Sequence, residues 1–364
     1  MQLTRRRCAA MAIALSSSSL RRSVASFSNC YSAAALNNRR HDRNDGLRNV
    51  VYRLKSSTSR SDHPTLTSGS ACYKSLKQSR PMRIKAKALH PRDAASTKAA
   101  LVNDSHNNST SKTKIVHFQR HGQGTHNQIY KQWTDRTGIP IDLSETNPQL
   151  NPLLLPEVID APLTDKGRDQ CVQQRIDKRE YLGGVELIVV SPLVRALETA
   201  CITFEDHLPS TIKKDGGGEE GVRWIAHEGI REELGLLLCN QRRPLKETVL
   251  QFPHVDFSLL AHHETDEDVY WKQHCERTSI NNFDGMPQRE SIEDMSHRAY
   301  DFLVDYLYHR PEREIAVVGH SAWLLAMTNA VVEFDEESGD VEEFGTMFGQ
   351  AELRSATLTF TKSN

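Results

Sequence analysis

The stretch VHFQRHGQGTHN, residues 116–127, joins an apolar run to a glycine-flanked turn that carries an arginine and a histidine. The apolar residues before the turn predict a short strand over residues 114–118. The residues after it, 123–133, are compatible with a helix that has glycines at its start. A strand that leads into a helix within a few residues is typical of α/β proteins.

Two later stretches have a similar form. VELIVVSP, residues 185–192, and EIAVVGHS, residues 314–321, are continuous apolar runs that end at a proline and at a Gly-His-Ser turn. Runs without a polar face suit strands that are buried on both sides, as in a parallel sheet. Helical patterns alternate with them, most clearly over residues 290–307, where Ser291 and Asp294 form a predicted capping box. The alternation therefore predicts an α/β fold with a parallel sheet.

Other elements are predicted between these strands. Thr164 is a predicted N-cap for a helix over residues 168–176. The stretches LVRALETACITF, VRWIAHEGI, AWLLAMTNAVV and ELRSATLTF predict, in that order, a helix, a strand, a helix and a final strand. Residues 240–289 are irregular and rich in charge and histidine, and we expect them to form an insertion near the functional site.

Three turns follow the C-terminal ends of predicted strands and carry side chains suited to an anion. Open α/β sheets bind ligands outside the carboxyl ends of their strands. Glycine N–H groups attract anions, and an arginine can bind two phosphate oxygens at once. The residues expected to form this anion pocket are Arg120, His121, Gly122, Arg195 and His320.

A histidine in such a pocket suggests phosphoryl chemistry. A neutral imidazole can attack phosphorus as a nucleophile, and fixed cations stabilise the charge that develops on the phosphoryl oxygens. The leaving alkoxide then needs a proton from a carboxylic acid. The stretch HEGIREELG, residues 227–235, follows a predicted strand and offers three candidates for this acid, which are Glu228, Glu232 and Glu233.

The order of these motifs resembles the histidine phosphatase superfamily, also called phosphoglycerate mutase-like. The matching motifs are RHG, SPxxRAxxT at residues 191–199, and GHS. Asn127, six residues past His121, and LTxxG at residues 163–167 fit the family as well. The resemblance covers residues 114–330, about 60% of the chain. It implies a three-layer α/β/α sandwich with a mostly parallel central sheet.

The resemblance implies a role for each matching residue. His121 is similar to the nucleophile that becomes phosphohistidine. Glu232 is similar to the proton donor of a eukaryotic group in which a cysteine and an Arg-Arg pair follow the acid. Ser321 stands where the acid-phosphatase-like branch carries its acid, which indicates the mutase-like branch. The expected phosphate-binding residues are Arg120, Arg195 and His320, with Gly122 and Asn127 beside them.

Several of these assignments leave an alternative open. Glu233 is a second candidate for the acid. Asn127 either contacts the phosphate or caps its helix, and the adjacent His126 is expected to line the mouth of the site. Arg242 and Arg243 either bind a distal phosphate of the substrate or are surface charges.

The residues that follow RHG distinguish two activities within the family. Mutases carry Glu-Ser-x-Trp-Asn there, whereas this chain has Gln-Gly-Thr-His-Asn. The resemblance therefore implies a phosphomonoesterase that transfers the phosphoryl group to water and needs no metal and no cofactor. The alternatives are a cofactor-dependent phosphoglycerate-type mutase and a phosphate-binding regulatory protein on the same fold. The expected substrate is a phosphorylated small molecule or else a phosphoprotein; neither a nucleic-acid partner nor stable membrane insertion is expected.

The N-terminal part of the chain differs from the rest in charge. Residues 1–113 hold 21 Lys and Arg against five Asp and Glu, whereas the remainder holds 25 against 42. Residues 1–41 contain seven arginines and no acidic residue, which is typical of a transit peptide to a mitochondrion or plastid. A secretory-type signal is one alternative, and a plain basic tail on a cytoplasmic protein is another. We expect a disordered basic linker over residues 42–113, followed by the phosphatase-like domain over residues 114–364, with its insertion at 240–289.

Overall fold

The structure is a computed structural model of the 364-residue chain. It describes residues 80–103, 111–209, 221–260, 265–280, 282–334 and 344–363. All of these residues fall within one compact unit of the chain, Asp62–Asn364. The predicted transit peptide, residues 1–41, lies outside the described residues. Within the described part, no helix is both long enough and apolar enough to cross a membrane.

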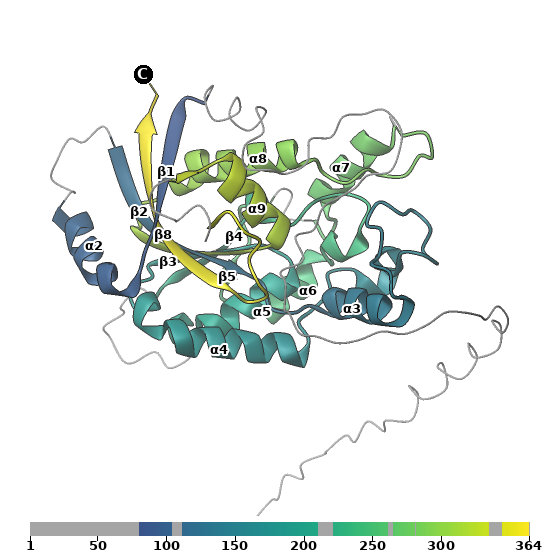
Figure 1. The fold of residues 1–364 in the computed structure, drawn as a ribbon, viewed down its shortest axis with the longest axis horizontal. Helices are drawn as coiled ribbons and strands as arrows, with labels where there is room; N and C mark the ends of the chain where they lie inside the picture. Colours follow the sequence, from purple (N-terminus) through teal and green to yellow (C-terminus); the bar gives the residue numbers. More distant parts are fainter. Residues whose placement is uncertain are drawn as a thin grey trace, which may run out of the picture. The chain divides into compact units, whose positions relative to one another are not determined.

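A central sheet of eight strands runs through this unit (Figure 1), in the order β5-β4-β3-β6-β2-β8-β1-β7. Only β8 is antiparallel to its neighbours, β2 and β1, and the other pairs are parallel. The sheet is therefore mostly parallel, as predicted. Its strands are β1 (Met82–Ala88), β2 (Ser111–Arg120), β3 (Leu187–Val190), β4 (Arg223–Ala226), β5 (Val255–Asp256), β6 (Glu314–Gly319), β7 (Glu333–Phe334) and β8 (Leu353–Lys362).

Helices connect the strands and form the outer layers. A π-helical turn, Phe302–Leu307, extends the helix that begins at Ile292. Short 3-10 turns include Glu228–Ile230 and Leu238–Asn240, which both lie near the carboxyl ends of strands. The described helices are α2 (Pro91–Asn103), α3 (Thr125–Thr137), α4 (Asp165–Leu182), α5 (Val194–Thr203), α6 (Leu245–Gln251), α7 (Val269–Ser279), α8 (Ile292–Asp301) and α9 (Ser321–Ala330).

Helices cover both faces of the sheet, which makes the fold a three-layer α/β/α sandwich. Figure 1 shows α8 and α9 on one face and α4 and α5 on the other. The central strand β6 supplies both cores, because successive side chains of a strand point to opposite faces. Ile315 and Val317 pack with the α8 and α9 layer, whereas Ala316 and Val318 pack with the α4 and α5 layer. All four side chains are fully buried, so the apolar runs are strands buried on both sides, as predicted.

The predicted helix starts are confirmed at two positions. The Thr164 side chain accepts a hydrogen bond from the Gly167 N–H at 3.0 Å at the start of α4. Ser291 accepts one from the Asp294 N–H at 3.0 Å at the start of α8. In both helices a short hydroxyl side chain satisfies an N–H group that has no partner within the helix.

The predicted disordered linker is wrong for residues 82–103, which form β1 and α2. Along β1, apolar Met82, Ile84 and Ala86 are buried, while the basic residues between them are exposed. The strand pairs with β8 over seven residue pairs, from Met82 with Lys362 to Ala88 with Ala356. Composition conceals such a strand because its polar face is basic, whereas alternation at a period of two residues would have revealed it. The folded part therefore begins before the expected boundary at residue 114.

The predicted irregular insertion at residues 240–289 is wrong in part, because it contains α6, β5 and α7. Strand β5 adds to the edge of the sheet beside β4. Helix α7 begins at an N-cap, Asp268, whose side chain accepts from the Trp271 N–H at 3.2 Å. The same carboxylate forms a buried ion pair with Arg231, with 2.7 Å between Arg231 Nη1 and Asp268 Oδ1. The segment is rich in charge partly because buried ion pairs hold it to the domain.

Candidate active site

The carboxyl ends of neighbouring strands bring the predicted turns together. Strand β6 lies between β2 and β3, and Arg120 at the end of β2 is in register with Gly319 at the end of β6. The His121 N–H donates to the Gly319 carbonyl at 3.0 Å. The rings of His121 and His320 consequently lie with their centroids 5.1 Å apart. Three segments that are distant in sequence thus meet at one edge of the sheet.

The His121 ring is buried, and its hydrogen bonds define one tautomer. Nδ1 lies 2.6 Å from the Gly122 carbonyl oxygen, which can only accept a hydrogen bond. Nε2 lies 3.3 Å from Arg195 Nε, which can only donate one. The proton is therefore on Nδ1, and Nε2 carries a lone pair. Burial and the neighbouring Arg195 charge hold the pKa of His121 well below its usual value, so the ring is neutral.

Arg195 lies in the first turn of α5 and is completely buried. Its guanidinium donates to the Cys239 carbonyl at 2.7 Å and to Asn240 Oδ1 at 2.9 Å, in addition to His121. One turn further along, the Thr199 hydroxyl donates to the Arg195 carbonyl at 2.7 Å. Each nitrogen of the guanidinium thus donates one hydrogen bond, and one further N–H on each Nη is left to bind an anion.

Arg120 and His320 complete the predicted group of cationic and imidazole side chains. Half-buried Arg120 donates to the Phe348 carbonyl at 2.6 Å. His320 Nε2 lies 2.7 Å from the Ser191 hydroxyl oxygen, while its buried Nδ1 has no hydrogen-bond partner among the described residues. Burial, followed by the Arg195 charge, keeps the pKa of His320 well below its usual value. Ser191, at the start of the SPxxRAxxT motif, thus orients His320, and Arg195 belongs to the same motif.

Gly122 and Gly167 allow two backbone segments to touch. A Cβ added to Gly122 would lie 2.5 Å from the Gly167 carbonyl oxygen. A Cβ added to Gly167 would lie 2.2 Å from the Gln123 carbonyl oxygen. The Gly122 N–H, predicted to face phosphate, donates to the Thr199 hydroxyl at 3.0 Å. The two glycines therefore serve close packing of the His121 loop against α4, which explains why RHG and LTxxG occur together in this chain.

The carboxyl group of Glu232 lies at the N-terminus of α9, the helix that begins directly after His320. Its Oε1 accepts from the Ala322 N–H at 3.2 Å, and its Oε2 accepts from the Ser321 hydroxyl at 3.3 Å. Glu232 thus brings a carboxyl group beside residue 321, the position at which this sequence has serine in place of an acid.

The two other glutamate candidates are held in ion pairs. Glu233 binds Arg289 through both oxygens, with Arg289 Nη2 2.6 Å from Glu233 Oε2. Glu228 pairs with buried Arg231, with 3.1 Å between Oε2 and Nη1. Burial raises the pKa of Glu233, and the Arg289 charge opposes that shift. Of the three carboxyl groups, only that of Glu232 contacts the segment that follows His320.

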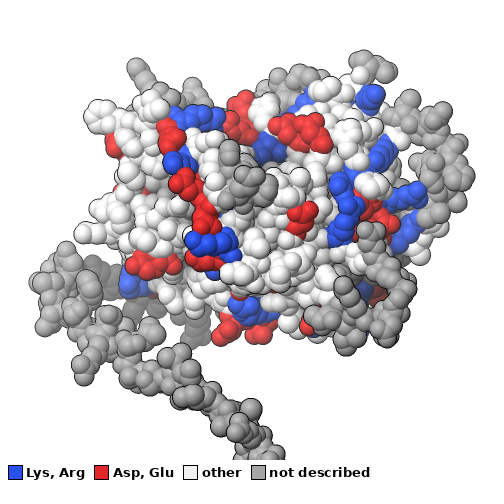
Figure 2. Space-filling model, turned by 180° about the vertical axis from the view of Figure 1, so that it is seen from behind, with Lys and Arg blue, Asp and Glu red and all other residues white. Residues whose placement is uncertain are grey.

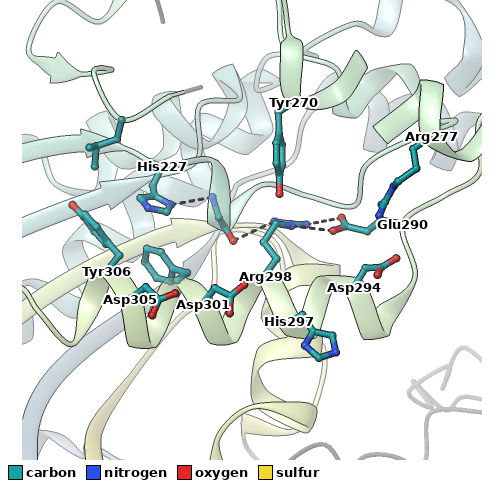
Figure 3. Close-up of a pocket in the computed structure, with 13 residues that line it drawn as sticks. His227, Tyr270, Arg277, Glu290, Asp294, His297, Arg298, Asp301, Asp305 and Tyr306 are labelled. Atoms are coloured by element: carbon teal, nitrogen blue, oxygen red, sulfur yellow. Dashed lines mark hydrogen bonds and ion pairs between the residues drawn. The ribbon is translucent and has the colours of Figure 1, made fainter. Parts of the chain in front are cut away.

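A buried ion pair holds the loop that carries Glu232 (Figure 3). Arg298 of α8 binds Glu290 through two hydrogen bonds, 3.0 Å from Nε to Oε1 and 2.6 Å from Nη2 to Oε2. Arg298 Nη1 also donates to the Gly229 carbonyl at 3.2 Å. Glu290 Oε2 accepts from the Leu234 N–H at 3.1 Å. Both ends of the loop that contains Glu232 are therefore fixed to one arginine–glutamate pair.

Arg298 and Glu290 also line the hollow drawn in Figure 3, which has a volume of about 600 Å³. Acidic side chains of the α8 segment, among them Asp294, Asp301 and Asp305, form part of its wall. None of the predicted site residues lines it. The hollow is thus separate from the group of side chains around His121.

The remaining predicted residues have structural contacts. Asn127 Oδ1 accepts from the Gly124 N–H at 3.0 Å, which is the helix-capping alternative. Arg242 is buried, and its guanidinium donates to two backbone carbonyls at 3.0 Å. Arg243 forms an ion pair with Asp160, with 3.4 Å between Nε and Oδ2. The surface-charge alternative is wrong for Arg242, because the residue is only 3% exposed.

Sequence reasoning missed two residues that hold the site together. Thr199 links the Arg195 carbonyl to the Gly122 N–H, and as the last residue of SPxxRAxxT it could have been found from the motif. Asn240 accepts from Arg195 through Oδ1 and donates from Nδ2 to the Glu233 carbonyl at 2.8 Å. No sequence signal reveals Asn240, because only the folded path of residues 238–240 places it there.

Two further observations describe the surroundings of the site. Among the described residues, no group of three or more His, Cys, Asp or Glu side chains is arranged to hold a metal ion. Figure 2 shows acidic and basic side chains mixed across one face of the molecule. On that face, within the described part, the basic side chains do not form one continuous surface.

The chain is similar in sequence to proteins from a plant and a yeast. It is 31% identical over 269 residues to phosphoglycerate mutase-like protein 1 of Arabidopsis thaliana, an alignment that covers 67% of this chain and 81% of the relative. It is 27% identical over 212 residues to a Schizosaccharomyces pombe protein named "Probable phosphatase", with 57% of this chain and 74% of the relative covered. No family model matches the chain.

Solved structures with similar folds include two phosphatases. A mycobacterial glucosyl-3-phosphoglycerate phosphatase is 17% identical with a TM-score of 0.32, covering 66% of this chain and 90% of its own. A phosphoserine phosphatase from Entamoeba histolytica is 16% identical with a TM-score of 0.32, covering 66% and 89%. Likenesses at this level of identity and TM-score say nothing about the substrate of this chain.

Proposed function

The chain belongs to the phosphoglycerate mutase-like branch of the histidine phosphatase superfamily, and from that premise we propose that it hydrolyses phosphate monoesters through a phosphohistidine at His121. Its relatives in sequence include a phosphoglycerate mutase-like protein and a protein named as a phosphatase. The proposed substrate class is a phosphorylated small molecule, with a phosphoprotein as the other option.

The observation that carries this proposal is the hydrogen bonding of His121. Because Nδ1 donates to the Gly122 carbonyl, Nε2 presents its lone pair beside the Arg195 guanidinium. A neutral imidazole next to a fixed cation is the arrangement that nucleophilic attack on a phosphoryl group requires. The cation attracts the anionic substrate and withdraws from Nε2 when a phosphoryl oxygen takes its hydrogen bond.

The proposed reaction has two steps. His121 Nε2 attacks phosphorus while the bond from phosphorus to the leaving oxygen breaks, and Glu232 gives a proton to that oxygen. Water then attacks the phosphohistidine, Glu232 takes a proton from the water, and the P–N bond breaks. Phosphate leaves, and both side chains return to their initial states. The proposal includes no metal and no organic cofactor, because Arg120, Arg195 and His320 supply the charge and hydrogen bonds around the phosphoryl oxygens.

The contacts of Glu232 support its place in this reaction. Its carboxyl group reaches the first residues of α9, directly beyond His320, while Glu233 is occupied by Arg289. The hold of Arg298 and Glu290 on the Glu232 loop fixes the carboxyl group relative to the pocket. These contacts matter because a general acid must lie within hydrogen-bond reach of the leaving oxygen.

Hydrolysis of a panel of phosphate esters by the full chain in the presence of EDTA tests the proposal. We expect phosphate release that is lost in His121→Ala, and a phosphoenzyme in the wild type that is labile in acid and stable in alkali. Turnover that persists in His121→Ala would contradict the assignment of the nucleophile. Turnover that EDTA abolishes would contradict the metal-free reaction.

The same experiment separates the two alternatives. No release on any ester, together with phosphoryl exchange when a bisphosphoglycerate primer is added, would indicate a cofactor-dependent mutase. Phosphate binding without either reaction would indicate a regulatory phosphate-binding protein. The sequence after RHG favours hydrolysis, because it lacks the Glu-Ser-x-Trp-Asn pattern of the mutases.

We also propose that residues 1–41 direct the protein to a mitochondrion or plastid, on the strength of their seven arginines and absence of acidic residues. Since the described domain includes β1 from Met82 onward, a fluorescent fusion of residues 1–79 tests the address without part of the domain. Import is the expected result, and replacement of Arg5, Arg6 and Arg7 by alanine should reduce it. A diffuse cytoplasmic signal from the unaltered fusion would contradict the proposal.

A further inference from the structure

A third histidine lies beside the proposed nucleophile. His126 is the second residue of α3 and is only 8% exposed. The centroid of its ring is 5.5 Å from that of His121. Among the charges that act on it, those of Arg195 and Arg120 are the largest, so the ring lies within the field of the proposed phosphate-binding residues.

Gly124 makes room for the His126 ring in this position. A Cβ on Gly124 would lie 2.6 Å from both Cε1 and Nδ1 of His126, closer than such atoms can approach. The φ of Gly124 is −86°, an angle that any residue adopts. The second glycine of RHGQG is therefore needed for space rather than for backbone conformation, and the space is filled by an imidazole.

The His126 ring lacks the hydrogen bonding that a structural histidine has. Its Nδ1 is buried and has no partner among the described residues. His117, a buried histidine of β2, provides a comparison within the same chain, since its two nitrogens lie 2.8 Å from Ser355 Oγ and 3.1 Å from Glu314 Oε1. Buried polar atoms in native proteins nearly always have a partner, so an exception calls for an explanation such as a ligand.

We propose that His126 is a substrate-contacting residue that donates a hydrogen bond from Nδ1 to a phosphoryl oxygen of the substrate. The inference rests on the proposed function, because it assumes that a phosphoryl group occupies the space next to His121. A phosphoryl oxygen only accepts hydrogen bonds, and a neutral imidazole can place its single N–H on the nitrogen that faces an acceptor. His126 would then bind the phosphoryl group together with Arg120, Arg195 and His320.

Burial and the Arg195 charge hold the pKa of His126 well below its usual value. A neutral ring contributes a directed hydrogen bond without adding a third full positive charge to the pocket. It can therefore remain buried beside two arginines before substrate binds. In the complex, a dianionic phosphoryl group strengthens the N–H donor, because hydrogen bonds to charged acceptors are stronger than those between neutral groups.

Three substitutions in the full chain test this contact. His126→Phe fills the same space without any donor, and His126→Asn retains an N–H donor on the atom that replaces Nδ1. Gln128→Ala is the control, because Gln128 lies on the same helix but is exposed. The probes are inorganic phosphate and orthovanadate, whose binding is measured by calorimetry and does not require turnover.

We expect His126→Phe to weaken the binding of both probes by about tenfold or more, as loss of a hydrogen bond to a charged group does. His126→Asn should recover part of the affinity, and Gln128→Ala should bind as the wild type. The unfolding temperature of His126→Phe should equal or exceed that of the wild type, because the change removes a buried nitrogen without a partner. A purely structural histidine would instead make His126→Phe less stable and leave the affinity of the folded protein unchanged.

The outcomes separate this inference from the proposed function. Affinity that depends on His126 in a protein without turnover would support the contact and contradict only the hydrolase. Turnover with unchanged probe affinity in His126→Phe would support the hydrolase and overturn the contact. Wild-type protein that binds neither probe would overturn both. If His126→Phe does not fold, His126→Leu replaces it as the variant without a donor, and a loss of affinity below twofold in His126→Leu would contradict the contact.

Discussion

Glu232 and its neighbour Glu233 differ in what their carboxyl groups bind, and this difference predicts different effects of the same substitution. Glu232→Gln should slow the hydrolysis of alkyl phosphates by about 10²–10⁴-fold, the usual contribution of a general acid. Aryl phosphates with good leaving groups need less protonation and should lose much less. Steady-state kinetics on one ester of each type measures the two effects.

Glu233→Gln serves as the matched control, because it changes the adjacent glutamate and removes an ion pair with Arg289 instead. It should affect stability more than the ratio of the two rates. If both ester types lose the same factor in Glu232→Gln, the acid is another group. A selective loss on alkyl phosphates in Glu233→Gln would identify Glu233 as that group.

Several buried histidines predict how the free energy of unfolding depends on pH. Burial is the leading cause that lowers the pKa of His121, His126 and His320 well below the usual value, and it lowers that of His227 to about 4. In the unfolded chain these groups take up protons near pH 6.5, whereas in the folded chain they do not. The free energy of unfolding should therefore fall as the pH decreases below about 6.5, by about 1.4 kcal/mol per pH unit for each such histidine.

Urea unfolding between pH 7 and pH 5 measures this slope. His227→Asn removes one of the titrating groups while it keeps an acceptor for the Gly229 N–H, which now donates to His227 Nδ1 at 2.9 Å. Its slope should be smaller, by a difference that grows toward about 1.4 kcal/mol per pH unit as the pH falls from 7 to 5. An identical slope in the variant would mean that His227 is protonated in the folded protein, in contradiction to the burial argument.

At the level of elements, the two glycines at the ends of α4 are in opposite situations. Gly167→Ala would place a Cβ 2.2 Å from the Gln123 carbonyl oxygen, a backbone atom that cannot move away alone. The loop that carries His121 must then shift, so we expect lower stability and lower kcat together. Around Gly183 no atom lies within 4 Å of an added Cβ, and its backbone is helical with a φ of −62°.

Gly183→Ala should therefore leave kcat unchanged and keep stability equal or raise it by about 0.4–1 kcal/mol, because alanine reduces the freedom of the unfolded chain. Thermal unfolding and steady-state kinetics of the two variants check the pair. Wild-type kcat in Gly167→Ala would show that the contact between the His121 loop and α4 does not position the nucleophile.

The elements that the sequence predicts well are those whose pattern is local. Strands β3 and β6 are continuous apolar runs, and Thr164 and Ser291 cap helices through contacts three residues away. The motifs also placed Arg120, His121, Arg195 and His320 together, because strand ends in a parallel sheet share one edge. By contrast, the roles of Asn240 and of the Arg298–Glu290 pair depend on segments that approach one another only in the fold.

At the level of the whole molecule, β1 belongs to the folded domain although it precedes the expected boundary at residue 114. It lies between β8 and β7, and its buried side chains join the core under α8 and α9. Composition placed this strand in a basic linker, because its exposed residues are arginine and lysine. The predicted boundary at residue 114 is thus based on the exposed, basic face of β1, whereas the buried, apolar face of the strand packs in the core.

This placement predicts the behaviour of two shortened chains. Residues 80–364 retain β1 and should unfold at nearly the temperature of the full chain, with the same phosphatase activity. Residues 105–364 lack β1, so the long strand β8 would lose seven backbone pairs and become an exposed edge. Exposed edge strands promote association between molecules, and the buried apolar residues of β1 would leave part of the core uncovered.

We therefore expect residues 105–364 to have a lower unfolding temperature and to aggregate, which circular dichroism melting and size-exclusion chromatography would measure. Adding a synthetic peptide of residues 80–90 tests the cause, because it can restore the pairing with β8 and should recover part of the stability. A chain of residues 105–364 that is monomeric and as stable as residues 80–364 would contradict the role of β1. In that case β1 would not be needed for the stability of the domain, and the part of the chain from β2 onward would fold without it.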